Sequence, residues 1–125
     1  TQKIIKNMIK NKTGSIINIA SNAASEVDLG RAAYATSKAS IITFTKILAK
    51  ELGSYGIRVN SISPGLTNTD MMGEGISEKI MTETISKIPF KRVAQPEEIA
   101  NTCFFLASDL SSYITGENIS VTGGY

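Results

Sequence analysis

Two side chains in this sequence have the types and the spacing of a proton-transfer pair. Tyr34 and Lys38 stand four residues apart in the string YATSK, so a helix would place them one turn apart on the same face. A phenol titrates near a pH of ~10, but a neighbouring ammonium favours the phenolate form. The pair is therefore a candidate acid and base at neutral pH. Because most pairs with this spacing are ordinary surface neighbours, the interpretation needs supporting residues.

Supporting residues follow two segments that we expect to be strands. The run SIINIA (15–20) is apolar and β-branched on both faces, which is typical of a parallel strand buried on both sides. Ser21 comes directly after it, and its hydroxyl is suited to hold a substrate carbonyl or hydroxyl. Pro64 and Gly65 follow the second predicted strand, IRVNSIS (57–63). A tight turn there would let backbone amides approach a ligand.

Helical patterns separate these strands. The periodicity predicts helices over residues 2–10, 32–54, 76–88 and 96–107, and a third strand over residues 118–122 that ends at Gly123. Strands that alternate with helices indicate an α/β fold with a parallel sheet. Ligands of such sheets bind beyond the carboxyl ends of the strands. We therefore expect the chemistry at the ends marked by Ser21, Pro64–Gly65 and Gly123.

Apolar spacing assigns a buried face to each helix. In the helix over 32–54 the residues expected to face inward are Ile41, Phe44, Ile47, Leu48 and Leu52. In the helix over 96–107 they are Ile99, Cys103, Phe104 and Leu106. Cys103 is thus expected to be a core thiol and not a nucleophile. The series Lys3, Lys6, Lys10 and Lys12 is interpreted as a solvated helix face and not as an anion site.

Composition excludes several classes of protein. The 125 residues carry 13 Lys and Arg against 11 Asp and Glu, a balance that argues against a nucleic-acid partner. The sequence has no His and one Cys, which excludes His-based catalysis, the usual zinc sites and an internal disulfide. A lone thiol suits a cytoplasmic location. No apolar run approaches the roughly 18 residues of a membrane span, so we expect no membrane partner.

Five ordered segments carry a more specific signal: GSIINIAS, YATSK, IRVNSISPGLTNTDM, IPFKRVAQPEEIA and FLASDLSSYITGENISVTGG. Together they resemble the short-chain dehydrogenase/reductase family, most closely its 3-oxoacyl-acyl-carrier-protein reductases. The resemblance covers essentially the whole chain. It implies a Rossmann-like, doubly wound parallel sheet and an oxidoreductase that transfers hydride between NADP or NAD and a carbonyl or alcohol, with NADPH favoured.

The resemblance also implies a role for each candidate residue. Tyr34 would protonate the substrate oxygen as hydride arrives and would also contact the cofactor, and Ser21 would orient that oxygen. Lys38 would hydrogen-bond the nicotinamide ribose and favour the phenolate form of Tyr34. The nicotinamide carboxamide would meet the backbone of Pro64, Gly65 and Thr67 and the side chain of Thr69.

Partners and substrate choice come from the same resemblance. The substrate would be a small-molecule or acyl-carrier-bound carbonyl, selected by a lid over Met71–Ile88. Met71 and Met72 fit a flexible lid over an apolar substrate nearly as well as they fit ordinary loop positions. The complete protein would be a homo-oligomer in which the helix bearing Tyr34 packs against its copy in a second subunit.

The departures from the family pattern concern the cofactor. Members are about twice this length, and no GxxxGxG phosphate loop occurs in the sequence. Thr122 stands where an acidic residue is common. We therefore interpret residues 1–125 as the C-terminal part of a single Rossmann domain whose N-terminal cofactor-binding half is absent. The SIINIA strand would then be an exposed edge, and the piece alone would be inactive.

Three functions remain open at this point. The first is reduction of 3-oxoacyl-acyl-carrier-protein by the complete protein. The second is a sugar, polyol or other alcohol dehydrogenase of the same family, since the same Ser-Tyr-Lys set serves both directions. The third is an inactive truncated module with only a structural or interaction role.

Overall fold

The computed structural model describes residues 2–26, 29–69 and 77–125. Its helices are α1 (Gln2–Asn11), α2 (Ala32–Leu52), α3 (Glu78–Lys87) and α4 (Pro96–Ala107), and its strands are β1 (Gly14–Ile19), β2 (Ile57–Pro64) and β3 (Asn118–Val121). Each predicted segment is present, with ends that differ by one or two residues. Within the described residues, no helix has both the length and the apolar character needed to cross a membrane.

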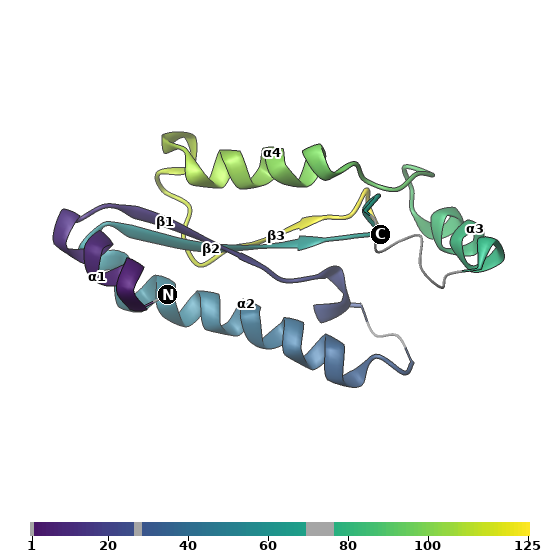
Figure 1. The fold of residues 1–125 in the computed structure, drawn as a ribbon, viewed down its shortest axis with the longest axis horizontal. Helices are drawn as coiled ribbons and strands as arrows, with labels where there is room; N and C mark the ends of the chain where they lie inside the picture. The colour runs from purple at the N-terminus through teal and green to yellow at the C-terminus, as the bar shows by residue number, and fades with distance from the viewer. Residues whose placement is uncertain (1, 27–28, 70–76) are drawn as a thin grey trace.

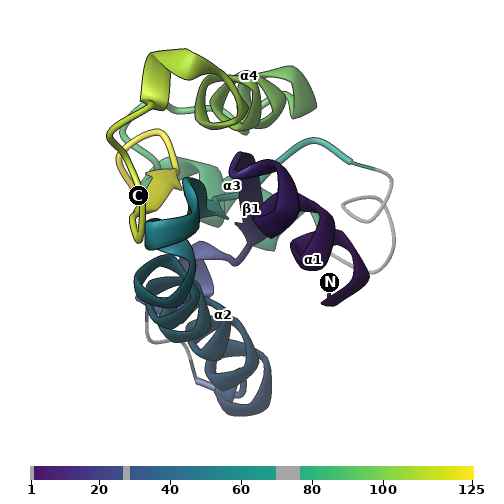
Figure 2. The same ribbon diagram turned by 90° about the vertical axis from the view of Figure 1, so that its left-hand side faces the viewer.

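The described strands form a parallel sheet in the order β1-β2-β3. Helix α4 covers one face of this sheet, and α1 and α2 lie against the other (Figures 1 and 2). Helix α3 lies beyond the carboxyl ends of the strands, near Tyr125 at the end of the chain (Figure 1). The predicted α/β class with a Rossmann-like parallel sheet is therefore confirmed.

The central strand is the most enclosed element. Ile57, Val59 and Ile62 of β2 are 0–1% exposed, because β2 is paired on both sides and covered on both faces. Ile57 and Val59 pack with Ala49 and Leu52 of α2 in the main apolar cluster. Strand β1 is only half-buried. This differs from the expectation of a strand buried on both sides, since one edge of β1 has no partner strand among the described residues.

Three inward predictions for the helices are wrong. Phe44 and Ile47 are each 51% exposed, and Phe104 is 74% exposed. In α2 the fully buried side chains are Thr45, Ala49 and Leu52, a stripe with the helical spacing of four and three residues. The apolar spacing correctly predicts that Leu52 is buried, but it misses Thr45 and Ala49 because one is polar and the other is small. Cys103 is half-buried with a free thiol, and so is less enclosed than a core residue.

Buried polar side chains join β2 to the segment that leads into β3. The Asn60 amide donates to Ile114 O at 2.9 Å and accepts from Glu117 N at 3.1 Å. Ser61 and Ser63 donate to Asn118 Oδ1 at 2.9 and 3.0 Å. All three β2 side chains are 0% exposed. These bonds fix β3 beside β2, because a buried polar group without a partner is costly.

Arg58, the second residue of β2, links the strand to the end of α4. Its guanidinium donates to Leu106 O at 2.7 Å, Ser108 O at 3.1 Å and Ser111 Oγ at 2.8 Å. The first two acceptors are carbonyls at the end of the helix, where backbone acceptors have no helical partner. A cation there also complements the negative end of the helix dipole.

Gly56 directly precedes β2, at a point where only glycine fits. Its φ is +71°, and a Cβ would lie 2.6 Å from Lys12 O. Gly53, three residues earlier, has a helical φ of −58° and open space around the same position.

We predict that Gly56→Ala lowers the free energy of unfolding by about 2 kcal/mol or more, because it combines a left-handed conformation with a backbone collision. Gly53→Ala is the matched control. It should leave stability unchanged or raise it by roughly 0.4–1 kcal/mol. Urea unfolding followed by circular dichroism measures both, and equal midpoints for the two variants would contradict the assignment.

Candidate active site

Ser21 is placed where the chain leaves the sheet. Ala20 N donates to Ile62 O at 2.8 Å, which continues the β1–β2 ladder by one residue. Ser21 is extended, with φ −165°, and its Oγ accepts from Ala23 N at 3.2 Å to cap a short turn over Asn22–Ala24. This bond uses a lone pair of the hydroxyl and does not use its O–H. The side chain is thus fixed in place with a proton still to donate.

Tyr34 and Lys38 lie together on α2 as their spacing predicts. Tyr34 is in the first turn and is 50% exposed. The Lys38 ammonium lies 5.9 Å from the centroid of the Tyr34 ring and donates to Ile19 O at 3.3 Å. The last carbonyl of β1 therefore holds the ammonium beside the phenol.

One cavity is lined by three of the predicted site residues. Ser21, Tyr34 and Gly65 line a space of about 380 Å³ that is closed on another side by α3 and Tyr125. Within the described chain, Lys38, Pro64, Thr67 and Thr69 are not part of its lining. The arrangement places two hydroxyl-bearing residues, from different elements, on the lining of the same small space.

The far wall of this cavity tests the lid prediction. Ile80, Met81 and Thr84 of α3 line it, together with Lys87 and Ile88, so the second half of the segment Met71–Ile88 borders the site. Met71 and Met72 themselves lie outside the described residues. Arg31, Glu26 and Lys87 bring charge to the lining. Sequence reasoning missed Tyr125, Arg31 and Lys87 here because nothing in their local strings marks them.

The segment after β2 is held from two sides. Gly65 N donates to Val121 O at 2.9 Å, and a Cβ on Gly65 would lie 3.0 Å from the Cα of Thr122. Further on, Ala94 N donates to Leu66 O at 2.9 Å and Asn68 N donates to Ala94 O at 2.8 Å. Glycine is needed where the backbone passes this close to the end of β3.

The two threonines of this segment differ. Thr67 Oγ1 donates to Gly65 O at 3.0 Å, so its side chain supports the turn. The Thr67 backbone is paired with Ala94 in an isolated parallel bridge. Thr69 is exposed. Contacts of Pro64, Gly65, Thr67 and Thr69 with a nicotinamide remain predictions.

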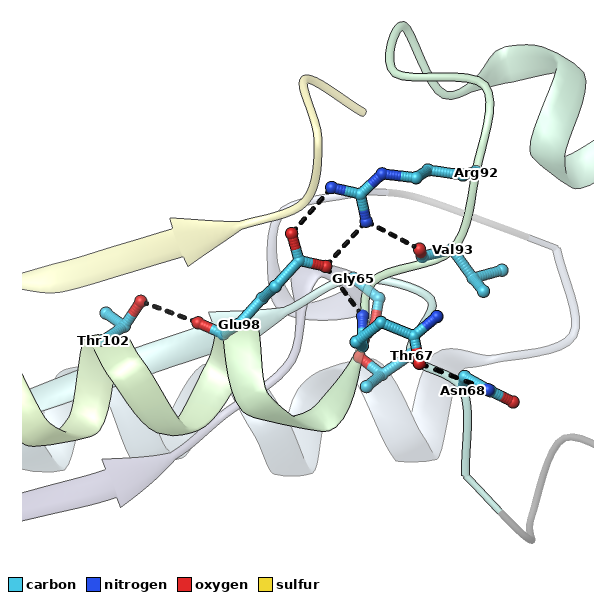
Figure 3. A network of polar contacts seen from close by, with 8 residues as sticks. Gly65, Thr67, Asn68, Arg92, Val93, Glu98 and Thr102 are labelled. Carbon is cyan, nitrogen blue, oxygen red and sulfur yellow. Dashed lines mark hydrogen bonds and ion pairs between the residues drawn. The ribbon is translucent and has the colours of Figure 1, made fainter.

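An ion pair that sequence reasoning missed lies next to this segment. Arg92 donates through both terminal nitrogens to Glu98, at 2.6 and 2.7 Å (Figure 3). Glu98 Oε2 also accepts from Gln95 N at 2.8 Å, at the start of α4. The hydrogen bond from Arg92 and then the one from Gln95 N lower the pKa of Glu98 to about 2. The string Gln95-Pro96-Glu97-Glu98 has the spacing of a capped helix start, but nothing local marks Arg92 as its partner.

No group of three or more His, Cys, Asp or Glu side chains that could hold a metal ion occurs in the described ranges. The close backbone approach at Gly65 borders the same cavity as Ser21 and Tyr34.

Comparison with known proteins places this geometry in a family. The family model described as Enoyl-(Acyl carrier protein) reductase matches residues 1–125. The 3-oxoacyl-[acyl-carrier-protein] reductase of Chlamydia muridarum is 48% identical over 97% of this chain and 48% of its own length. The protein of the same name from Aquifex aeolicus is 45% identical over 99% of this chain and 50% of its own length. The chain thus spans about half the length of these relatives.

Solved structures agree with this placement. A 3-oxoacyl-[acyl-carrier protein] reductase from Brucella melitensis superimposes with a TM-score of 0.88 and 37% identity, over 95% of this chain and 44% of that one. A 7α-hydroxysteroid dehydrogenase in complex with NADH and 7-oxo glycochenodeoxycholic acid gives a TM-score of 0.95 and 36% identity, over 98% and 48%. The expected resemblance is therefore confirmed: the chain belongs to the short-chain dehydrogenase/reductase family, close to its 3-oxoacyl-acyl-carrier-protein reductases.

Proposed function

We propose that these residues form the catalytic and substrate-binding part of an NAD(P)-dependent reductase that acts on a 3-oxoacyl group carried by acyl carrier protein. The observation that carries the proposal is the shared cavity: Ser21 and Tyr34 line it, and the Lys38 ammonium lies 5.9 Å from the centroid of the Tyr34 ring. Relatives named 3-oxoacyl-[acyl-carrier-protein] reductase support the substrate class.

Each residue has one task in this reaction. Ser21 donates its O–H to the substrate oxygen and orients the carbonyl, since its own position is fixed by Ala23 N. Tyr34 gives its phenolic proton to the same oxygen as negative charge develops there. The Lys38 ammonium stabilises the phenolate that remains. A bound nicotinamide supplies the hydride to the carbonyl carbon.

Cofactor contacts are assigned by the same proposal. The backbone of Pro64, Gly65 and Thr67 would hold the nicotinamide carboxamide, with the Thr69 side chain at the same end. Either NADP or NAD fits this assignment. Residues 1–125 are then the C-terminal part of one Rossmann domain, and the lone thiol of Cys103 suits a cytoplasmic location.

A second candidate is an alcohol dehydrogenase of the same family. The likeness to the 7α-hydroxysteroid dehydrogenase favours it, because the same hydroxyl pair can serve oxidation of an alcohol. Rates with 3-oxoacyl thioesters, polyols and hydroxysteroids as substrates of the complete protein separate the two. Absence of turnover with all three would favour the truncated module instead.

We predict that Tyr34→Phe in the complete protein lowers kcat by roughly 100-fold or more, because the proton donor is lost while the ring is kept. The dissociation constant of the dinucleotide should change by less than about twofold, since its contacts remain. Tyr55→Phe, at the other end of α2, is the control and should keep the wild-type rate. Retention of more than a few per cent of the rate by Tyr34→Phe would remove the acid role.

We also propose that α2 packs against its copy in a second subunit. Phe44 and Ile47 stand three residues apart on α2 and so share a face. Each is 51% exposed, and apolar side chains that lie together at a surface can mark an interaction site.

The double variant Phe44→Glu, Ile47→Glu should raise the dissociation constant of that assembly roughly 100-fold or more, because it would bury unpaired carboxylates. Lys46→Glu, between the two positions and exposed, controls for charge. Analytical ultracentrifugation of the complete protein gives the result. Equal sedimentation of the double variant and the control would exclude α2 from the interface.

The isolated chain should bind dinucleotide poorly. A glycine-rich turn at a helix N-terminus is the usual anchor of the pyrophosphate, and the 125 residues contain no GxxxGxG string. We expect residues 1–125 alone to self-associate through the β1 edge and to be inactive. Size-exclusion chromatography and NADPH titration test this, and a monodisperse monomer with micromolar affinity would contradict it.

A further inference from the structure

The Arg92–Glu98 pair is exposed to solvent, but its two side chains are held in a defined orientation. Both side chains are well exposed, at 50% and 40%, and exposed ion pairs add little to folding stability. Yet the contact is bidentate, with both guanidinium nitrogens engaged, and such pairs fix orientation as well as distance. Arg92 also donates to Val93 O at 3.1 Å. The pair joins the two ends of residues 92–98, which form a corner at the start of α4.

This corner carries the segment that follows β2. Ala94, inside the corner, exchanges two backbone hydrogen bonds with Leu66 and Asn68, at 2.9 and 2.8 Å. The Asn68 side chain adds a contact of 3.4 Å to Gln95 Oε1. Figure 3 shows Thr67 and Asn68 beside the corner. On its other side the segment is held at Gly65 by the end of β3.

The Arg92 guanidinium and the Glu98 carboxylate both stay charged at every pH at which an enzyme assay is run. The pKa of Glu98 is about 2 because Arg92 and Gln95 N both donate to the carboxylate. Protonation therefore does not open the corner in that range, and substitution is the direct way to test it.

We propose that Arg92 and Glu98 are positioning residues: their ion pair sets the place of Leu66–Asn68 beside the cavity of Ser21 and Tyr34, and through it the binding of the nicotinamide end of the dinucleotide. The proposal rests on the proposed function only for that last step. The structural step, from the ion pair to the segment, stands on the hydrogen bonds described above.

The experiment compares Glu98→Gln with Glu97→Gln in the complete protein. Both variants remove one carboxylate from the first turn of α4, but Glu97 has no bond to Arg92. Glu98→Gln should raise KM for NADPH by about tenfold, because small displacements of a positioning element have large effects on binding and rate. KM for the carbonyl substrate should change by less than about twofold. Glu97→Gln should match the wild type in both constants.

Two further variants separate positioning from loss of folding. The double variant Arg92→Gln, Glu98→Gln should be no worse than Glu98→Gln, because the two residues act as one unit. Arg92→Lys should have a smaller effect on KM for NADPH than Arg92→Gln, since lysine keeps the positive charge but cannot make the bidentate contact. Melting temperatures of Glu98→Gln and Glu97→Gln should be nearly equal.

Amide hydrogen exchange tests the structural step without activity. The amides of Asn68 and Ala94 should exchange at least about tenfold faster in Glu98→Gln than in Glu97→Gln, while the Gly65 amide should not. Unchanged exchange at Asn68 and Ala94, or an NADPH KM equal to that of Glu97→Gln, overturns the proposal. If the wild type shows no turnover with NADPH or with NADH, the proposed function fails, and the exchange result still decides whether the pair positions the segment.

Discussion

The need to pair every polar side chain buried on β2 determines much of this structure. Asn60, Ser61 and Ser63 are fully enclosed, and all their partners come from the stretch Ile114–Asn118. An unpaired group at any of them would cost more than a typical hydrogen bond contributes. The register between β2 and β3 is therefore set by the need to pair these buried polar groups. It places Val121 and Thr122 against Gly65 and so defines one border of the candidate site.

The site inherits its precision from these fixed strand ends. Ser21 leaves β1 one residue beyond the ladder, and Lys38 is tied to the last carbonyl of the same strand. Tyr34 reaches the cavity from the first turn of α2, a helix anchored to the core at its other end through Ala49 and Leu52. Ser21 and Tyr34 thus border one cavity because β1 ends and α2 begins beside it, and the Lys38 ammonium is held next to the Tyr34 ring by Ile19 O.

Patterns of local origin could be predicted from the sequence, and contacts between distant segments could not. Alternation of strands with helices and the spacing of Tyr34 and Lys38 both rest on short-range periodicity. Apolar spacing wrongly predicts that Phe44 faces inward, because Thr45 and Ala49 occupy the buried stripe of α2. The Arg92–Glu98 pair and the position of Tyr125 on the cavity lining depend on the path of loops between distant segments. Short sequence patterns do not predict that path.

Helix α4 is tied at both ends, by Arg58 at its last carbonyls and by Arg92 at its first turn. The length of α4 is therefore fixed by the distance between these two contacts. One residue inserted or deleted within it would turn one end by about 100° and shift it by about 1.5 Å relative to the other. Either Arg58 or Arg92 would then lose its acceptors. Length changes in a descendant of this protein should accordingly collect in the connecting loops, and α4 should keep its twelve residues.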